Sequence, residues 1–412
     1  MATTAHDDSS PVHDFDLRAL PAAFYVDPFP TYRALREETP IRLMPDGSYL
    51  LTRYADCAVA YGDPKLFSSD KKVEFKPKFG DTPLFEHHTT SLVFNDPPLH
   101  TRVRKLVMGA LLPRAIAQME PGLIELVHRL LDQMAAKQAR GETVDLIEDF
   151  ASAIPIEIIG NLLGVPHDER GPLRGWSLAI LGALEPRISA EQMDRGNRAV
   201  TDFLAYLEGL VADRRVNPGD PQTDVLTRLI EGEVDGVGLT HVELLQNCIF
   251  LLNAGHETTT NIIGNSLELL HRFPEARAAL IADPALMRTA LEEFLRYESP
   301  NQLGNRITTA ETAIGGIAMP AGTRITTCIG AANRDPETFP DPDRFDITRE
   351  PNRHLAFAAG VHQCAGMNVA RMEARHAISL LLQRFPDYTL AGEPVRGGRV
   401  RFRGFSRLPV RL

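Results

Sequence analysis

The strongest constraint on the fold is a long segment of helical spacing that runs from Thr240 to about Arg272. Thr240 is followed three residues later by Glu243, the capping-box pattern that marks a helix start, and no proline appears before Pro274. Roughly 30 residues at about 1.5 Å each give a helix of about 45 Å. A helix of that length crosses a whole domain, so its middle must be buried.

The middle of this helix is a poor helix former. Residues 253–260 read NAGHETTT, and glycine costs about 1 kcal/mol relative to alanine in a helix, with threonine costing somewhat less. Threonine hydroxyls also compete for backbone carbonyls and bend helices. Two interpretations fit: a tolerated polar patch with a packing glycine, or a distortion that brings a carboxylate and a hydroxyl to a buried site.

Most of the remaining chain also has helical periodicity. Apolar residues recur at helical spacing through residues 102–291, alternate as in strands through 305–330, and resume helical spacing from about Gly366 to Phe385. Residues 70–96 lack clear periodicity and are predicted to be irregular, and residues 333–363 to be coil. Because no repeat or Ser/Gly linker divides the chain, we expect one mainly α domain with small β-sheets over residues 1–412, with residues 1–26 as a loose lead-in.

Composition narrows the class of protein. The 412 residues include 44 Lys and Arg against 54 Asp and Glu, a net charge of −10, which is ordinary for a globular protein and excludes a disordered or fibrous chain. The acidic balance argues against nucleic acid as a partner. No run of about 18 apolar residues predicts a membrane span, and the polar N-terminus does not resemble a secretory signal. We therefore expect a soluble cytoplasmic protein.

The cysteines single out one loop. None of the four forms a C-x-x-C pair, which argues against a zinc site or a disulfide framework, and Cys57, Cys248 and Cys328 are expected to be small buried side chains. Cys364 differs because residues 357–366 read FAAGVHQCAG, so that glycines flank it and a helix follows. A helix N-terminus favours an anionic sulfur. The loop therefore predicts that Cys364 is a metal ligand or a nucleophile.

A third pattern is a charged pair. Glu293 and Arg296 lie at i, i+3 on a helix that Asp283-Pro284 starts and Pro300 ends. Alone, such a pair is worth a fraction of a kcal/mol at a surface. Arg344, in the downstream segment DPDRF, could supply a second guanidinium to Glu293.

These three patterns, in this order, resemble the cytochrome P450 family of haem-thiolate proteins from about Asp27 to the C-terminus. Residues 254–259 resemble the oxygen-binding groove in the family's long helix. The family's structural triad is matched by Glu293, Arg296 and Arg344. Residues 357–366 resemble the family's haem-binding loop, which implies that Cys364 is the axial ligand. The resemblance implies the P450 fold as a single triangular haem domain, mainly α with small β-sheets. It implies haem b, iron protoporphyrin IX, as cofactor.

The resemblance also assigns cofactor-binding roles to individual residues. Residues 96–104 read DPPLHTRVR and resemble the start of the helix whose His and Arg bind a haem propionate. The resemblance implies that the cofactor is bound by His100, Arg104, Arg306, His362, Phe357, Ala254, Gly255 and Gly366. Ala358 departs from the pattern, since many members carry glycine there, but Gly360 and Gly366 are retained.

The resemblance also implies the reaction. The enzyme would insert one atom of O2 into a small organic substrate, by hydroxylation or oxidative dealkylation, with Thr258 and Glu257 as the catalytic pair. Segments 72–94, 173–190, 247–254, 301–305 and 402–405 would set specificity, and their polar and aromatic residues suggest an aromatic or oxygenated substrate.

Electrons would come from an external ferredoxin with its NAD(P)H reductase. Five basic residues form a candidate docking patch for that partner: Arg102, Lys105, Arg353, Arg371 and Arg375. The alternative is that these charges are simply solvated. One alternative to the monooxygenase is a peroxide-driven haem-thiolate peroxygenase, but the Glu257–Thr258 pair argues against it. The other is a non-catalytic haem sensor of gases or ligands, for which we expect no turnover.

Overall fold

The computed structural model describes residues 12–234 and 236–412, and over these residues the chain is mainly α-helical with small sheets. The α-helices are α1 (Ala22–Val26), α2 (Phe29–Glu38), α3 (Tyr54–Gly62), α4 (Lys72–Phe79), α5 (Pro83–Thr90), α6 (Leu99–Ala110), α7 (Pro113–Ala139), α8 (Ala153–Leu163), α9 (Leu173–Gly182), α10 (Ala190–Val216), α11 (Val225–Glu231), α12 (His241–Arg272), α13 (Pro274–Ala282), α14 (Met287–Tyr297), α15 (Ile329–Ala332) and α16 (Met367–Arg384). Shorter helical turns are η1 (Leu92–Phe94), η2 (Ile147–Ala151), η3 (His167–Glu169), η4 (Pro284–Leu286) and η5 (Gly360–His362).

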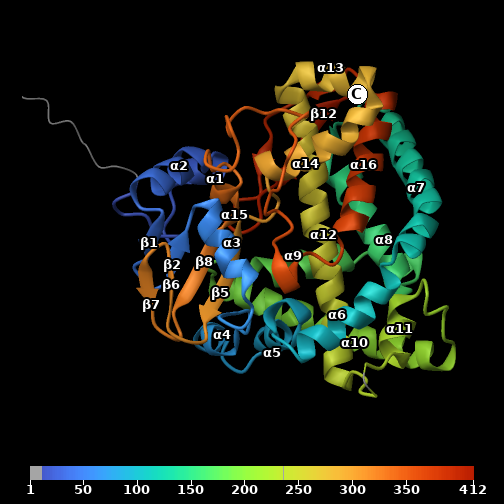
Figure 1. Ribbon diagram of the computed structural model, residues 1–412. Helices are drawn as coiled ribbons and strands as arrows, with labels where there is room; N and C mark the ends of the chain where they lie inside the picture. Colours follow the sequence, from blue (N-terminus) through green and yellow to red (C-terminus); the bar gives the residue numbers. More distant parts are fainter. Residues whose placement is uncertain (1–11, 235) are drawn as a thin grey trace, which may run out of the picture.

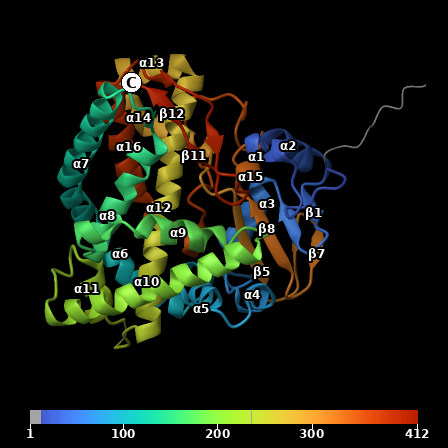
Figure 2. The ribbon, with the colours of Figure 1, turned by 180° about the vertical axis from the view of Figure 1, so that it is seen from behind.

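The strands form four small sheets within the described residues. The largest has the order β1 (Ile41–Leu43), β2 (Tyr49–Leu51), β8 (Arg324–Cys328), β5 (Leu303–Thr308) and β3 (Phe67–Ser68). The others pair β4 (Val144–Asp145) and β9 (Thr389–Leu390) with β12 (Pro409–Arg411), β6 (Thr312–Ile314) with β7 (Ile317–Met319), and β10 (Val395–Arg396) with β11 (Phe405–Arg407). Figures 1 and 2 place the five-stranded sheet and the N-terminal helices on one side of the molecule and most of the longer helices on the other.

Helix α12 runs through the centre of the helical part in both views (Figures 1 and 2). Its predicted start is confirmed, because the Thr240 hydroxyl accepts from the Glu243 N–H at 3.2 Å and the Glu243 carboxylate accepts from the Thr240 N–H at 2.8 Å. Most of its middle is buried, and it packs against α8, α9, α10 and α16. The expected distortion does not interrupt the helix: the Thr258 hydroxyl donates to the Ala254 carbonyl at 2.8 Å, and the α-helical assignment continues through residue 260.

The β regions and the last long helix also agree with expectation. Strands β5 to β8 occupy most of the predicted segment 305–330, and α16 begins after Gly366 and ends before Phe385. In the part of the chain that the structure describes, no helix combines the length and the apolar character needed to span a bilayer.

Two expectations are wrong. Residues 70–96 are not irregular, because they form α4, α5 and η1; Thr82 caps α5 by accepting from the Phe85 N–H at 3.4 Å, and Pro83 occupies the first helical position. The lead-in 1–26 is ordered where it is described: Phe15 and Phe24 are buried against each other in an N-terminal cluster, and α1 follows. Residues 1–11 of that lead-in lie outside the described residues.

Candidate functional site

A cavity lies between α12 and the loop that precedes α16. Every residue predicted to bind the cofactor lines it: His100, Arg104, Arg306, His362, Phe357, Ala254, Gly255 and Gly366. Cys364 and Thr258 face the same cavity. Patterns from four separate parts of the sequence are therefore brought to one place.

The Cys364 loop is held by its own backbone. The Cys364 N–H donates to the Phe357 carbonyl at 2.9 Å, and Gly360 has φ +68° with Tyr61 O only 2.2 Å from where a Cβ would stand. Cys57, Cys248 and Cys328 are buried as predicted, whereas Cys364 is half-buried. Burial raises the pKa of the Cys364 thiol, and the Gly366 backbone N–H and nearby guanidinium groups act in the opposite direction.

The basic residues around this loop have no acid to pair with. The rings of His100 and His362 lie 4.2 Å apart between centroids, and the Nε2 atom of each is buried without a hydrogen-bond partner. Among the described residues, neither Arg104 nor Arg306 forms an ion pair. Burial, and then the positive charges of Arg306, His100 and Arg104, lower the pKa of His362 to about 2.

Such a cluster suits an anionic ligand. Buried cations without counter-charges are costly, and carboxylates that accept charge-assisted hydrogen bonds would remove that cost. The two propionates of a haem fit this requirement, and the Cys364 sulfur lies in the same cavity, where it would bind the iron as a thiolate. The residues present therefore fit a haem-thiolate cofactor.

Glu257 and Thr258, predicted as a catalytic pair, lie in different surroundings. Thr258 lines the cavity, whereas Glu257 is buried and is not part of the cavity wall among the described residues. Arg399 binds the Glu257 carboxylate with both distances near 2.5 Å. Burial raises the pKa of Glu257, and the Arg399 guanidinium opposes that rise. Arg399 follows α12 by more than a hundred residues, and its pairing carries no signal in the sequence.

Glu373 is a cavity residue that sequence reasoning missed. It lies on α16, is 2% exposed, and burial raises its pKa to about 8 against the effect of a hydrogen bond with Thr259. The Glu373 carboxyl therefore keeps its proton to higher pH than an exposed glutamate does. Its signal was available, because Glu373 lies on the apolar face that contains Val369, Met372 and Ala377.

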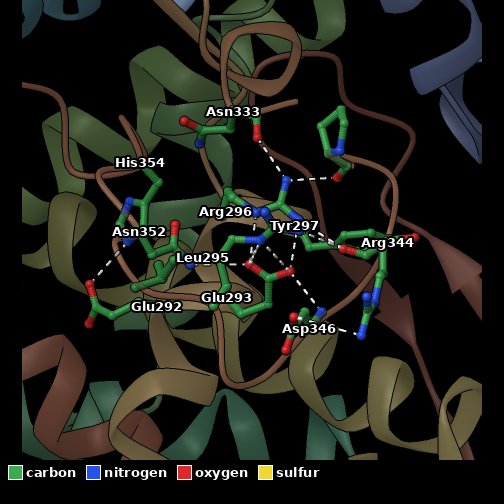
Figure 3. A network of polar contacts seen from close by, with 12 residues as sticks. Glu292, Glu293, Leu295, Arg296, Tyr297, Asn333, Arg344, Asp346, Asn352 and His354 are labelled. Atoms are coloured by element: carbon green, nitrogen blue, oxygen red, sulfur yellow. Dashed lines mark hydrogen bonds and ion pairs between the residues drawn. The ribbon is translucent and has the colours of Figure 1, made fainter. Parts of the chain in front are cut away.

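The structural triad needs one correction, at Arg344, whose side chain Figure 3 shows beside Asp346 rather than bound to Glu293. Glu293 and Arg296 form a fully buried two-bond ion pair, at 2.7 Å for both contacts. Arg344 does not reach Glu293: its side chain is 71% exposed and turns toward Asp346, and only its backbone carbonyl accepts from Arg296. The second guanidinium is that of Arg349, with Nε 3.3 Å from Glu293 Oε2. The backbone path of the loop brings Arg349 rather than Arg344 to Glu293, and the DPDRF motif does not encode that path.

All five segments expected to set specificity contribute to the cavity wall. Their cavity residues include His88, Leu92, Leu181, Leu184, Phe250, Asn301, Asn305 and Phe402. The predicted basic patch is mostly ion-paired: Arg102, Arg371 and Arg375 bind Glu243, Glu292 and Glu120, respectively. Within the described chain, Lys105 and Arg353 are its members without an ion pair.

Comparison with known proteins agrees with this arrangement. A family model described as Cytochrome P450 matches residues 186–389. The chain is 38% identical to cytochrome P450 107B1 of Saccharopolyspora erythraea, over 96% of this chain and 98% of that protein. It is 37% identical to the 6-deoxyerythronolide B hydroxylase of the same organism, over 95% and 97%. The solved structure of P450BioI, in complex with acyl carrier protein ligated to hexadec-9Z-enoic acid, matches with a TM-score of 0.89 and 34% identity, over 95% of this chain and 100% of that one.

The similarity covers nearly the whole of each relative, and the structural match confirms the P450 fold. Relatives named for their activity include the 6-deoxyerythronolide B hydroxylase and the cytochrome P450 monooxygenase PikC of Streptomyces venezuelae, as the resemblance of the three sequence patterns implied. The chain belongs to the cytochrome P450 family of haem-thiolate oxygenases.

Proposed function

We propose that the chain is a monooxygenase in which Cys364 would hold the iron of haem b, and that it inserts one atom of O2 into a small organic substrate, by hydroxylation or oxidative dealkylation. The observation that carries this proposal is the cavity that Cys364 and Thr258 share with unpaired basic residues. The chain would act as one haem domain. Its location in the cytoplasm stays a prediction.

The basic residues would bind and orient the cofactor. His100, Arg104, Arg306 and His362 would hold the propionates, while Phe357, Ala254, Gly255 and Gly366 would form the walls against the ring. When bound, a thiolate-ligated haem supplies oxygen activation and transfer. Gly255 also keeps α12 close to α8, because a Cβ there would lie 2.4 Å from Ile159 Cδ1.

Thr258 and Glu257 would take part in proton transfer to the cavity. The Thr258 hydroxyl proton is donated to the Ala254 carbonyl, so the oxygen is free to accept a hydrogen bond from a group in the cavity. Glu257 would carry protons from the side of Arg399 toward Thr258. Because Glu257 is ion-paired in the structure, its release from Arg399 would precede each transfer.

Electrons would come from a ferredoxin-type partner with its NAD(P)H reductase. Lys105 and Arg353, which lack ion pairs among the described residues, are the candidates for direct contact with an acidic partner. The aromatic or oxygenated substrate expected from the sequence is consistent with a cavity whose wall is apolar but includes Asn301, Asn305 and His88.

The test is spectroscopic and then catalytic. Purified holoprotein, reduced under carbon monoxide, should give the red-shifted band of sulfur ligation. Cys364→Ser should lose it, and Val361→Ala, an exposed change in the same loop, should keep it. A colourless wild-type protein, or one that lacks the band when freshly prepared, would refute the proposal.

The same preparation separates the alternatives. A monooxygenase forms product with NAD(P)H, reductase, ferredoxin and O2. A peroxygenase forms product from hydrogen peroxide at least as fast as from the electron chain, and a sensor forms none under either condition.

A further inference from the structure

The wall of the cavity contains an arginine that forms no ion pair among the described residues. Arg401 lines the cavity and is half-buried. Its Nη1 donates to the Leu303 carbonyl at 3.1 Å and its Nη2 to Asn305 Oδ1 at 2.6 Å, while Nε is buried without a partner. A guanidinium has five N–H donors, so these two bonds leave most of its capacity unused.

The charges of Glu185 and Glu74 act on the Arg401 guanidinium, but neither carboxylate forms an ion pair with it among the described residues. The carboxylate of Glu185 accepts from the backbone N–H groups of Val400 and Arg401, at 2.9 and 3.2 Å, and does not bind the guanidinium. Glu74 pairs with the buried Lys71 at 3.0 Å. Among the described residues Arg401 therefore has no ion pair, and Lys78 adds a further positive charge nearby.

His88 adds a neutral polar group to the same wall. Its Nε2 atom is buried without a hydrogen-bond partner, and its ring lies among Phe75, Phe79 and Phe94. Burial and the positive charges of His87, Lys78 and Arg401 hold its pKa well below the usual value, so the ring is neutral. The rest of this part of the cavity is apolar, with Leu92, Leu181, Leu184 and Phe250.

A haem does not account for Arg401. Four basic residues, His100, Arg104, Arg306 and His362, already face the Cys364 end of the cavity without acids, and a haem has two propionates for them. A partly desolvated guanidinium in a largely apolar cavity costs free energy unless a ligand brings the matching anion.

We propose that the substrate is an amphipathic organic acid whose carboxylate is bound by Arg401, with its apolar body in the cavity. This inference rests on the proposed monooxygenase and names its substrate class. His88 would provide a second hydrogen bond to the acid or to a polar group beside it. The oxidised carbon would then lie at a distance from the carboxylate that the cavity fixes.

The experiment measures binding to the holoprotein. Decanoic acid and decanamide, and 4-phenylbutanoic acid and 4-phenylbutanamide, are titrated as matched pairs, with the dissociation constant read from the spin-state absorbance change and from equilibrium dialysis. For at least one pair the acid should bind about tenfold to a hundredfold more tightly than the amide, the range expected for a charge-assisted hydrogen bond. Arg401→Gln should reduce this preference to about threefold or less without changing amide binding.

Three controls decide the outcome. Arg401→Lys should retain part of the preference, and Arg407→Gln, a 61% exposed arginine on β11, should retain all of it. The inference is overturned if neither acid binds more tightly than its amide, if Arg401→Gln weakens acid and amide equally, or if it lowers haem content while leaving the acid preference intact. A normal carbonyl band with no acid preference overturns only this inference, whereas a missing band refutes the proposed function itself.

Discussion

The guanidinium of Arg399 binds both carboxylate oxygens of Glu257, with Nη1 2.5 Å from Oε1 and 2.6 Å from Oε2. A second bond, from Arg399 Nη2 to the Leu178 carbonyl at 3.0 Å, fixes the guanidinium. The ion pair favours the charged form of a carboxyl whose burial favours the neutral form. The guanidinium of Arg399 thereby opposes protonation of the Glu257 carboxylate.

Arg399→Gln should move the pH profile of product formation. Loss of the guanidinium leaves burial as the main influence on Glu257, so the pKa of that carboxyl rises further and the corresponding limb of the profile shifts to higher pH. Steady-state product formation is measured from about pH 5 to about pH 9. Arg407→Gln serves as the control, and an unshifted profile would show that Arg399 is only structural.

The buried acid Glu293 gives a test of the corrected triad. Arg349→Ala removes a guanidinium that is 10% exposed and should lower the free energy of unfolding by about 3 kcal/mol, because it leaves a buried carboxylate with one partner fewer. Arg344→Ala changes a 71% exposed side chain and should cost about 0.5 kcal/mol or less. Unfolding of the two holoproteins is compared in denaturant. A larger cost for Arg344→Ala would restore the triad predicted from the sequence.

The haem-loop residue Ala358 adopts a conformation that suits glycine. Its φ is +54°, and the left-handed region costs an L-residue about 1 kcal/mol or more. Ala358→Gly should therefore raise the unfolding free energy by up to about 1 kcal/mol, after the entropy of the added glycine is subtracted. Gly360→Ala should do the reverse and lower holoprotein yield, since its Cβ would meet Tyr61 O at 2.2 Å. Thermal unfolding and haem content measure both, and a destabilised Ala358→Gly would contradict the argument.

Glu373 should make stability depend on pH. Burial raises its pKa in the folded protein to about 8, above the model-compound value of 4.5 that holds in the unfolded chain. Between those values the folded state keeps a proton that the unfolded state loses, so stability falls as pH rises. From about pH 5.5 to about pH 7.5 the wild type should lose about 1–2 kcal/mol more than Glu373→Gln. Equal slopes for the two proteins would exclude Glu373 as the cause.

Local signals in the sequence predicted the parts of the fold and site that depend on neighbours along the chain. The Thr240–Glu243 capping box located the start of α12, and the glycines beside Cys364 located a tight loop before α16. Each of these features is closed by contacts within a few residues, so its pattern is visible without the tertiary structure.

Contacts between distant segments were not predictable in the same way. Arg399 and Arg401 reach the site from an irregular segment near the C-terminus, and nothing beside them in sequence indicates Glu257 or the cavity. Arg349 rather than Arg344 contacts Glu293. The backbone carbonyl of Arg344 accepts hydrogen bonds from Arg296 and Arg349, and these contacts come from the tertiary structure. Helices α4 and α5 were missed because their few apolar residues carry no helical period, and a cap with a proline marks the start of α5.

Thr258→Ala tests the proton role of the hydroxyl apart from any structural role. The Thr258 side chain makes one bond, to the Ala254 carbonyl within its own helix, so its removal should leave haem content, the carbonyl band and substrate binding unchanged. The cavity would lose the hydrogen-bonding oxygen, and product formed per NADH should fall by about tenfold or more, at the low end of what a positioned proton-transfer group contributes. NADH consumption, product and hydrogen peroxide are measured together, with Thr260→Ala as the matched control because its hydroxyl donates to the His256 carbonyl in the same helix. Product, NADH and peroxide yields equal to those of the wild type would remove Thr258 from proton transfer, whereas equal losses in both variants would attribute the effect to the helix rather than to the hydroxyl.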